Sequence, residues 1–472
     1  MYIKSAQQSC HGQYRGNSKI VLLGLMASLL AVLPVYFIAQ PVFLLPLALA
    51  PFVILFVLRI PIWLCLGFVA FSFFRLHEAF PVLMPLHIPQ LLALPTLLVL
   101  IWHIGVKREV KPFWGPELGS FALFFCLVTI GLPFASNFGI ALAYWNGAYV
   151  KIGAMTISIA WLIRKERDFA LALIIMVLSG TLIAVVAISN KLGGIGLVEG
   201  TRVTIGRDFG SVLGDPNDLS LVLTFPLSFA VAMATTNQRW FLKILGIAGT
   251  GLIVWAVLCT QSRGGIIGTM AVFAITGLRV IKSKVVLAGI GGSAASLMLL
   301  FAGISDRASG GAAEDGIDES AMGRIWAWTA AYNMALAKPL HGVGLDNFIP
   351  NFWFYTPHWT GFNKAVHSTW MGVLAETGFP GLLSFVAMIV INLVVIFKAS
   401  RSLARNKAPV SVEALSYAVL SGFAGFIGSG TFLTQGFTWP VYILIAMTSA
   451  VSHFAKTFAI GNNADKTNQL NQ

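Results

Sequence analysis

Four arginines and one histidine in the segments between apolar runs have the side chains needed to bind an anion and accept a proton. The arginines are Arg202, Arg207, Arg263 and Arg324, and His367 begins the sequence HSTWMGVLAETGFPG. Guanidinium forks match the oxygens of a diphosphate, whose charge must be stabilised as it departs. An imidazole can accept the proton of an attacking hydroxyl, because its pKa lies near neutral pH. Converging arginines beside a histidine would therefore suit displacement of a diphosphate by a hydroxyl.

These residues also have ordinary structural interpretations. Arg263 lies in QSRGG, where it either binds an anion with glycine amides or extends to lipid headgroups. A lone histidine at a helix start is more often structural. Asp215 and Pro216 suit the cap and first turn of a helix, so capping explains this cluster without catalysis. Asp218 remains a candidate site residue, because a carboxylate at the lipid boundary is costly without a partner.

Composition indicates a membrane protein. Of the 472 residues, 57% are hydrophobic and 10% are charged, which is more apolar than a soluble core requires. The formal net charge is +13, but the basic residues lie in short clusters between apolar runs. This pattern argues against nucleic acid as a partner and is typical of cytoplasmic loops. The four cysteines have neither disulfide nor metal-ligand spacing.

The apolar runs predict an all-α fold, a polytopic transmembrane helical bundle of about 12–14 spans, each about 20 residues long. With a cytoplasmic N-terminus, the basic clusters fall in alternate loops, so both termini are expected in the cytoplasm. Run 60–74 is the least secure, because it is short and crowded by Arg59 and Pro61. The runs are residues 20–38, 41–58, 60–74, 90–106, 118–135, 141–163, 168–189, 213–235, 241–260, 264–281, 284–304, 380–398, 412–432 and 438–456.

Three parts are expected along the chain. Residues 1–304 should form N-terminal transmembrane helices with short outer loops, and residues 380–472 should form C-terminal transmembrane helices and a cytoplasmic tail. Between them, residues 305–379 should form an outer, periplasmic loop with amphipathic helices, because so long a connection is seldom idle. The first part of this loop, SDRASGGAAEDGIDES, lacks the spacing of a calcium loop and is expected to be solvated and mobile.

Helical spacing within this outer segment predicts two helices. In GRIWAWTAAYNMALAKP, apolar residues recur from Ile325 to Leu336 before a proline, which predicts a helix on the outer leaflet. Gly378 and the following proline should break the later helix. His367 and Glu376 would then lie at opposite ends and on opposite faces of a short helix, rather than forming an adjacent pair. Without paired outer carboxylates, we expect neither a metal nor another cofactor.

The motifs resemble those of a known family. GRIWAW, HGVGLDNF and HSTWMGVLAETGFPG occur in the order of the signature region of the O-antigen ligase and polymerase superfamily. SRGG and the arginines before GDPNDLS also match, so the resemblance extends from residue 200 to residue 440. These bacterial integral-membrane glycosyltransferases act on lipid-linked glycans. GDPNDLS is also similar to ligase-like proteins of exosortase systems, which are associated with protein O-glycosylation or exopolysaccharide export.

The resemblance implies an enzyme of the inner membrane, among membrane lipids, that takes a glycan from undecaprenyl diphosphate at the periplasmic face without a metal. His367 corresponds to the base, and Arg263 with either Arg202 or Arg207 corresponds to the diphosphate-binding arginines. Arg324 would order the periplasmic helices. Glu376 and Asp218 are supporting candidates.

Several acceptors and a second function class stay open. A ligase would use lipid A–core oligosaccharide, a polymerase another lipid-linked repeat, and an oligosaccharyltransferase a protein hydroxyl. We expect an O-antigen ligase that inverts the anomeric carbon by direct displacement. A transporter of the same lipid-linked glycan would need polar residues at mid-depth. The spans carry few charges there, and this favours an enzyme.

Overall fold

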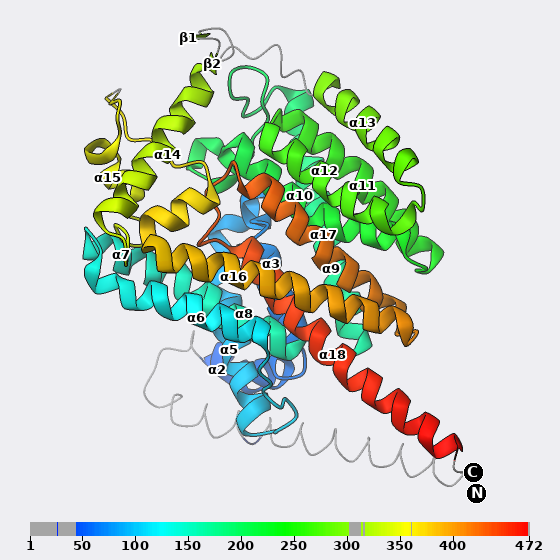
Figure 1. The fold of residues 1–472 in the computed structure, drawn as a ribbon. Helices are drawn as coiled ribbons and strands as arrows, with labels where there is room; N and C mark the ends of the chain where they lie inside the picture. The colour runs from blue at the N-terminus through cyan, green and yellow to red at the C-terminus, as the bar shows by residue number, and fades with distance from the viewer. Residues whose placement is uncertain (1–25, 27–43, 302–312, 315–316, 360, 471–472) are drawn as a thin grey trace, which may run out of the picture.

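The computed structural model describes residue 26 and residues 44–301, 313–314, 317–359 and 361–470, and this part of the chain is nearly all helix (Figure 1). The strands in the described part are β1 (Ala313–Glu314) and β2 (Ile317–Asp318), which pair antiparallel. The all-α prediction is therefore confirmed. The helices are α2 (Leu44–Val57), α3 (Pro61–Ser72), α4 (Leu76–Ala79), α5 (Ile88–Gly105), α6 (Pro116–Gly131), α7 (Phe138–Tyr144), α8 (Val150–Leu162), α9 (Glu166–Gly193), α10 (Pro216–Thr235), α11 (Trp240–Thr260), α12 (Arg263–Val280), α13 (Lys284–Phe301), α14 (Glu319–Ala337), α15 (Phe348–Tyr355), α16 (Thr369–Arg405), α17 (Val410–Gly430) and α18 (Trp439–Leu470).

Nine helices in the described residues are long and apolar enough to cross a membrane, which makes the chain a polytopic membrane protein. Each coincides with a predicted run, because hydropathy over about 20 residues is a strong signal. Run 20–38 lies outside the described residues, apart from Met26. The nine helices are α5, α6, α9, α10, α11, α12, α16, α17 and α18.

Runs 41–58 and 60–74 do not form two separate spans, so this prediction is wrong. They correspond to α2 and α3, which have 14 and 12 residues in the described part of the chain, fewer than a helix needs to cross the hydrocarbon core singly. A bend of 87° separates the two helices, which form at most one broken span or a re-entrant loop. Pro61 begins α3, and a proline ring cannot continue the hydrogen bonding of a preceding helix.

Two further runs are helical but interrupted or short. Run 141–163 contains α7 and α8, which are joined by the π-helical turn Trp145–Tyr149. Run 284–304 corresponds to α13, whose apolar part is shorter than that of the nine spans.

The bundle packs around α10, in which 83% of the apolar window is buried. Helices α9, α11, α12 and α17 pack directly against α10 and lie beside it in Figure 1. The N-terminal parts of α10 and α12 approach closely because α12 has Gly265 there. A Cβ atom added at Gly265 would lie 2.5 Å from Cβ of Ser220 in α10. A second group contains α6, α8, α16 and α18, and α3 and α5 pack against α8.

Helices α14 and α15 form an outer group with its own hydrophobic cluster, centred on Ala327, Ala331 and Phe352. The predicted helix before Pro339 is confirmed, because α14 ends at Ala337. In Figure 1 this group lies beside α7 and the start of α16. Tyr332 on α14 and Trp353 on α15 are 47% and 50% exposed. Most of the acidic loop that precedes α14 lies outside the described residues.

The predicted break at Gly378 is confirmed. This residue has φ 70° and ψ −171° inside α16, so the segment from Thr369 is offset from the long helix that follows. A side chain at this position would collide with the carbonyl oxygen of Pro339, and only glycine adopts this backbone region readily. The break therefore lets the residues before it belong to the outer group while the residues after it join the bundle.

Candidate active site

Three helices begin at one place in the structure. Their N-terminal caps are Asp215, Ser262 and Ser368, whose side chains accept hydrogen bonds from backbone amides of α10, α12 and α16. The prediction that Asp215 caps a helix is thus confirmed. Ser262 Oγ donates to Asn217 Oδ1 at 3.0 Å, which ties the starts of α12 and α10 together. Helix N-termini carry partial positive charge and exposed amides, so their convergence favours an anion.

Arg202 lies against this junction and is 8% exposed. Its Nη2 donates to Asn217 Oδ1 at 3.0 Å, and its Nε donates to the carbonyl oxygen of Thr260 at 3.2 Å. Asn217 therefore accepts from both Arg202 and Ser262. This network fixes the orientation of the guanidinium at the end of the bundle.

Arg263 and Arg324 lie close enough to Arg202 to affect its pKa. Burial lowers the pKa of Arg202, Asp215 and Glu199 oppose this effect, and Arg324 and Arg263 add to it. Arg263 begins α12 and Arg324 lies in α14. Three guanidiniums from different elements therefore share one positive region, which a bound anion would stabilise.

Arg207 occupies a different position. Its side chain is exposed, and its Nη1 donates to the carbonyl oxygen of Gly214 at 3.2 Å within the same loop. The sequence leaves Arg202 and Arg207 as equal candidates. The structure brings Arg202 together with Arg263 and Arg324, whereas Arg207 bonds Gly214 of its own loop.

His367 lies at the same junction, one residue before the cap of α16. Its backbone adopts φ 47°, a region costly for most residues and frequent at functional sites. Its backbone N–H donates to Thr434 Oγ1 at 3.1 Å. Burial lowers the pKa of His367, Arg324 lowers it further, and Asp215 opposes both. Among the described residues, the imidazole nitrogens form no hydrogen bond, which leaves them available to a ligand.

The loop after α17 contributes residues that the sequence did not single out. Gln435 Nε2 donates to Asp218 Oδ1 at 2.9 Å, and the Gln435 backbone N–H donates to Thr369 Oγ1 at 3.1 Å. Asp218 is therefore half-buried and has a partner that also contacts the start of α16. Polar residues in TFLTQGFT, between two spans, are the only signal in the sequence that points to this loop.

Glu376 does not join this junction. The residue is 8% exposed, and its carboxylate accepts hydrogen bonds from the backbone N–H groups of Asp346 at 2.9 Å and Phe348 at 3.3 Å. The expectation that His367 and Glu376 are not an adjacent pair agrees with these separate partners. Glu376 instead fastens the turn before α15 to α16.

Replacing Glu376 with alanine should lower the stability of the folded protein rather than abolish its chemistry. Two buried amides would lose their acceptor, and each such loss costs about 1–3 kcal/mol. Thermal unfolding in detergent should show a lower Tm for Glu376→Ala and a smaller decrease for Glu376→Gln, which keeps one acceptor oxygen. An unchanged Tm for Glu376→Ala would contradict this fastening role.

In the described part of the chain, no three His, Cys, Asp or Glu side chains are grouped closely enough to hold one metal ion. The charged groups assembled at the junction are arginines instead.

The fold and the site define a multi-pass helical membrane protein whose arginines, histidine and helix N-termini meet at one end of the bundle. A family model described as O-Antigen ligase matches residues 248–386, which confirms the resemblance to the O-antigen ligase and polymerase superfamily and supports a function of that type. The match is narrower than the expected 200–440. It includes Arg263, Arg324, His367 and Glu376, whereas Arg202, Arg207 and Asp218 precede it. No curated protein matches the chain.

Proposed function

We propose that the protein is an O-antigen ligase, a metal-independent inverting glycosyltransferase that moves a glycan from undecaprenyl diphosphate to lipid A–core oligosaccharide at the periplasmic face. The observation that carries this proposal is the convergence of Arg202, Arg263, Arg324 and His367 at the start of three helices. The family match supports the reaction class. Residues 305–379 would form the periplasmic subdomain over this site.

The proposed chemistry is a single displacement. The acceptor hydroxyl oxygen attacks the anomeric carbon, its proton passes to His367, and the bond from carbon to the diphosphate oxygen breaks. The diphosphate leaves with the electron pair, and Arg202, Arg263 and the helix N-termini stabilise its charge. Arg324 supports the positive field beside His367. A single substitution at the anomeric carbon, without a covalent sugar–enzyme intermediate, predicts inversion of the configuration at that carbon.

The proposed orientation rests on the charges at the two ends of the bundle. Arg279, Arg405 and Lys407 lie at or just beyond the ends of α12 and α16, opposite the proposed site, and basic loops are typical of the cytoplasmic side. A reporter inserted at residue 315 should be active only in the periplasm. A reporter after Lys407 should be active only in the cytoplasm, and the reverse pattern would contradict the proposed site location.

The transfer rate should fall in acid as His367 becomes protonated, because only the neutral imidazole can accept the hydroxyl proton. Burial and Arg324 lower the pKa of His367 from its ordinary value of 6.5, so the midpoint of this loss should lie below pH 6.5. Arg324→Gln should move the midpoint upward, because a neighbouring cation is removed. Rates measured across pH 4.5–8.5 with saturating donor would test this, and a midpoint unaffected by Arg324→Gln would contradict the assigned neighbour.

A further inference from the structure

We propose that the cavity between the ends of α10, α12, α16 and α17 binds an anionic glycerophospholipid that carries two phosphodiester groups. The cavity has a volume of about 520 Å³. Thr235, Arg279 and Arg405 line it. They lie at or next to the C-terminal ends of α10, α12 and α16, the three helices whose N-termini border the candidate active site. It therefore lies at the opposite end of the bundle and is separate from that site.

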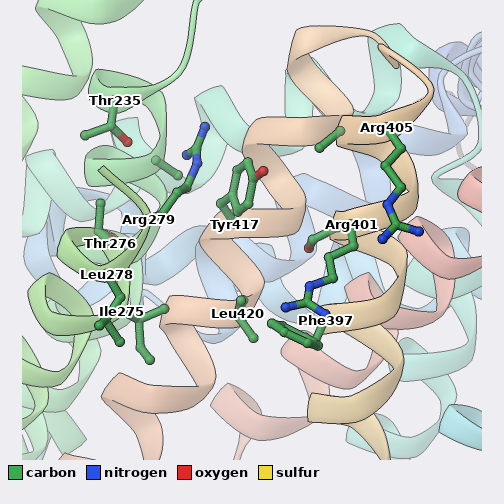
Figure 2. Close-up of a pocket in the computed structure, with 13 residues that line it drawn as sticks. Thr235, Ile275, Thr276, Leu278, Arg279, Phe397, Arg401, Arg405, Tyr417 and Leu420 are labelled. Atoms are coloured by element: carbon green, nitrogen blue, oxygen red, sulfur yellow. The ribbon is translucent and has the colours of Figure 1, made fainter. Parts of the chain in front are cut away.

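One wall of the cavity holds a guanidinium in a fixed orientation. Arg279 lies over the ring of Tyr417, with 3.4 Å between its Cζ atom and the ring centroid. Its Nη2 atom is 3.7 Å from Oε1 of Glu413. Stacking on an aromatic ring and one ion pair restrain the arginine while leaving other N–H groups for a ligand. Figure 2 shows Arg279 and Tyr417 side by side at the cavity.

The opposite wall carries two arginines one turn apart on α16. Arg401 lies over the ring of Phe397, with 4.1 Å between its Cζ atom and the ring centroid, and Arg405 follows four residues later. Figure 2 shows both side chains on the same side of the cavity. Neither forms an ion pair with any described residue. Like charges at this spacing repel, so a shared anion would stabilise them.

The charges at the cavity indicate how many anionic groups its ligand carries. Arg279, Arg401 and Arg405 contribute three positive charges, and Glu413 contributes one negative charge, which leaves two positive charges. Two phosphodiesters would balance this excess, which lies on the wall of Arg401 and Arg405, because Glu413 is paired with Arg279. Basic pockets between transmembrane helices are known to suit headgroups of this class.

Apolar surface continues from the charged walls, as an acyl-chain site requires. Ile275, Leu278 and Leu420 line the same cavity, and Figure 2 shows them on the side away from Arg405. A second cavity of about 740 Å³ lies beside it, shares Thr235 and Thr276 with it, and is otherwise lined mostly by apolar residues. Acyl chains in these spaces would bury apolar surface while the phosphates remain with the arginines.

Assigning this lipid to the cytoplasmic leaflet rests on the proposed orientation of the enzyme. Binding itself rests on the cavity alone. The test therefore measures lipid retention rather than glycan transfer, so failure of one proposal would not be mistaken for failure of the other.

The experiment is native mass spectrometry of the delipidated full-length protein in detergent, titrated with diphosphatidylglycerol, phosphatidylglycerol, phosphatidylethanolamine or undecaprenyl phosphate. Wild type should bind one diphosphatidylglycerol more tightly than the other three lipids. R401Q/R405Q should bind it roughly 30-fold more weakly, from about 1 kcal/mol per basic residue. The matched control is K398Q/K407Q, which removes the same charge from positions outside the cavity lining.

An unchanged affinity in the control and a weaker one in R401Q/R405Q would support the site. Equal losses in both double variants would overturn it, because general attraction to the basic end of the bundle would then explain binding. Preference for phosphatidylglycerol or undecaprenyl phosphate would overturn the two-phosphate occupant, and binding of none of the lipids would overturn the proposal. If the double variant does not fold, R401Q and R405Q singly should each weaken binding about fivefold.

Discussion

Replacement of His367 by alanine is expected to reduce glycan transfer by about 100- to 10,000-fold, the usual contribution of a general base. The imidazole lies at the junction of α10, α12 and α16, and its pKa is affected by Arg324 and Asp215. Without it, the acceptor hydroxyl would have to lose its proton to water. Single-turnover transfer of a radiolabelled glycan from undecaprenyl diphosphate would measure this loss separately from product release.

His367→Asn provides a variant with less risk to the fold. Asparagine tolerates the left-handed backbone that His367 adopts, but it has no basic nitrogen. The matched control is His358→Ala, which removes an exposed histidine from the outer segment, where its ring lies 4.4 Å from that of Trp326. Full activity in a folded His367→Asn protein would contradict the proposed base, and an equally large loss in His358→Ala would show that the loss is not specific to His367.

The second large effect is expected for replacement of Arg202, but not for replacement of Arg207 in the same loop. Arg202→Ala should lower the rate constant of transfer about 100- to 1,000-fold, as loss of one preorganised donor to a developing charge does in other enzymes. Arg207→Ala should leave it nearly unchanged, because Arg207 is exposed and bonds its own loop. Both rates would be measured with the same lipid-linked donor at saturation.

Arg202→Lys distinguishes charge from geometry at this position. A lysine keeps the charge but cannot reproduce the hydrogen bonds of Arg202 to Asn217 and Thr260, so its activity should lie between those of wild type and Arg202→Ala. Thermal unfolding of every variant separates lost catalysis from lost folding. A larger loss for Arg207→Ala than for Arg202→Ala would assign the diphosphate to the exposed loop instead.

Local patterns in the sequence predict much of this fold. Apolar runs identify the nine helices of the described residues that are long and apolar enough to cross a membrane, Asp215 identifies the start of α10, and Gly378 identifies the break in α16. Each signal depends on residues close together in the chain. The sharp bend between α2 and α3 was missed, because two short apolar runs separated by a charged residue and a proline also suit two spans.

The contacts that assemble the site are long-range, so sequence reasoning missed part of it. Gln435 and Asp218 are 217 positions apart, and the backbone N–H of His367 reaches Thr434 across 67 positions. The difference between Arg202 and Arg207 also depends on the folded structure, in which Arg202 bonds Asn217 at the junction and Arg207 bonds its own loop. No local pattern specifies either result.

The most direct test of the proposed base and acceptor is glycan transfer by the purified full-length protein in detergent, with undecaprenyl-diphosphate glycan and lipid A–core in the presence of EDTA. Wild type should produce glycosylated lipid A–core, and folded His367→Asn should produce almost none. Elongated lipid-linked chains, or transfer only to an added protein acceptor, would replace the ligase assignment with that of a polymerase or a protein glycosyltransferase. Equal transfer by wild type and folded His367→Asn would contradict the central claim that His367 acts as the base.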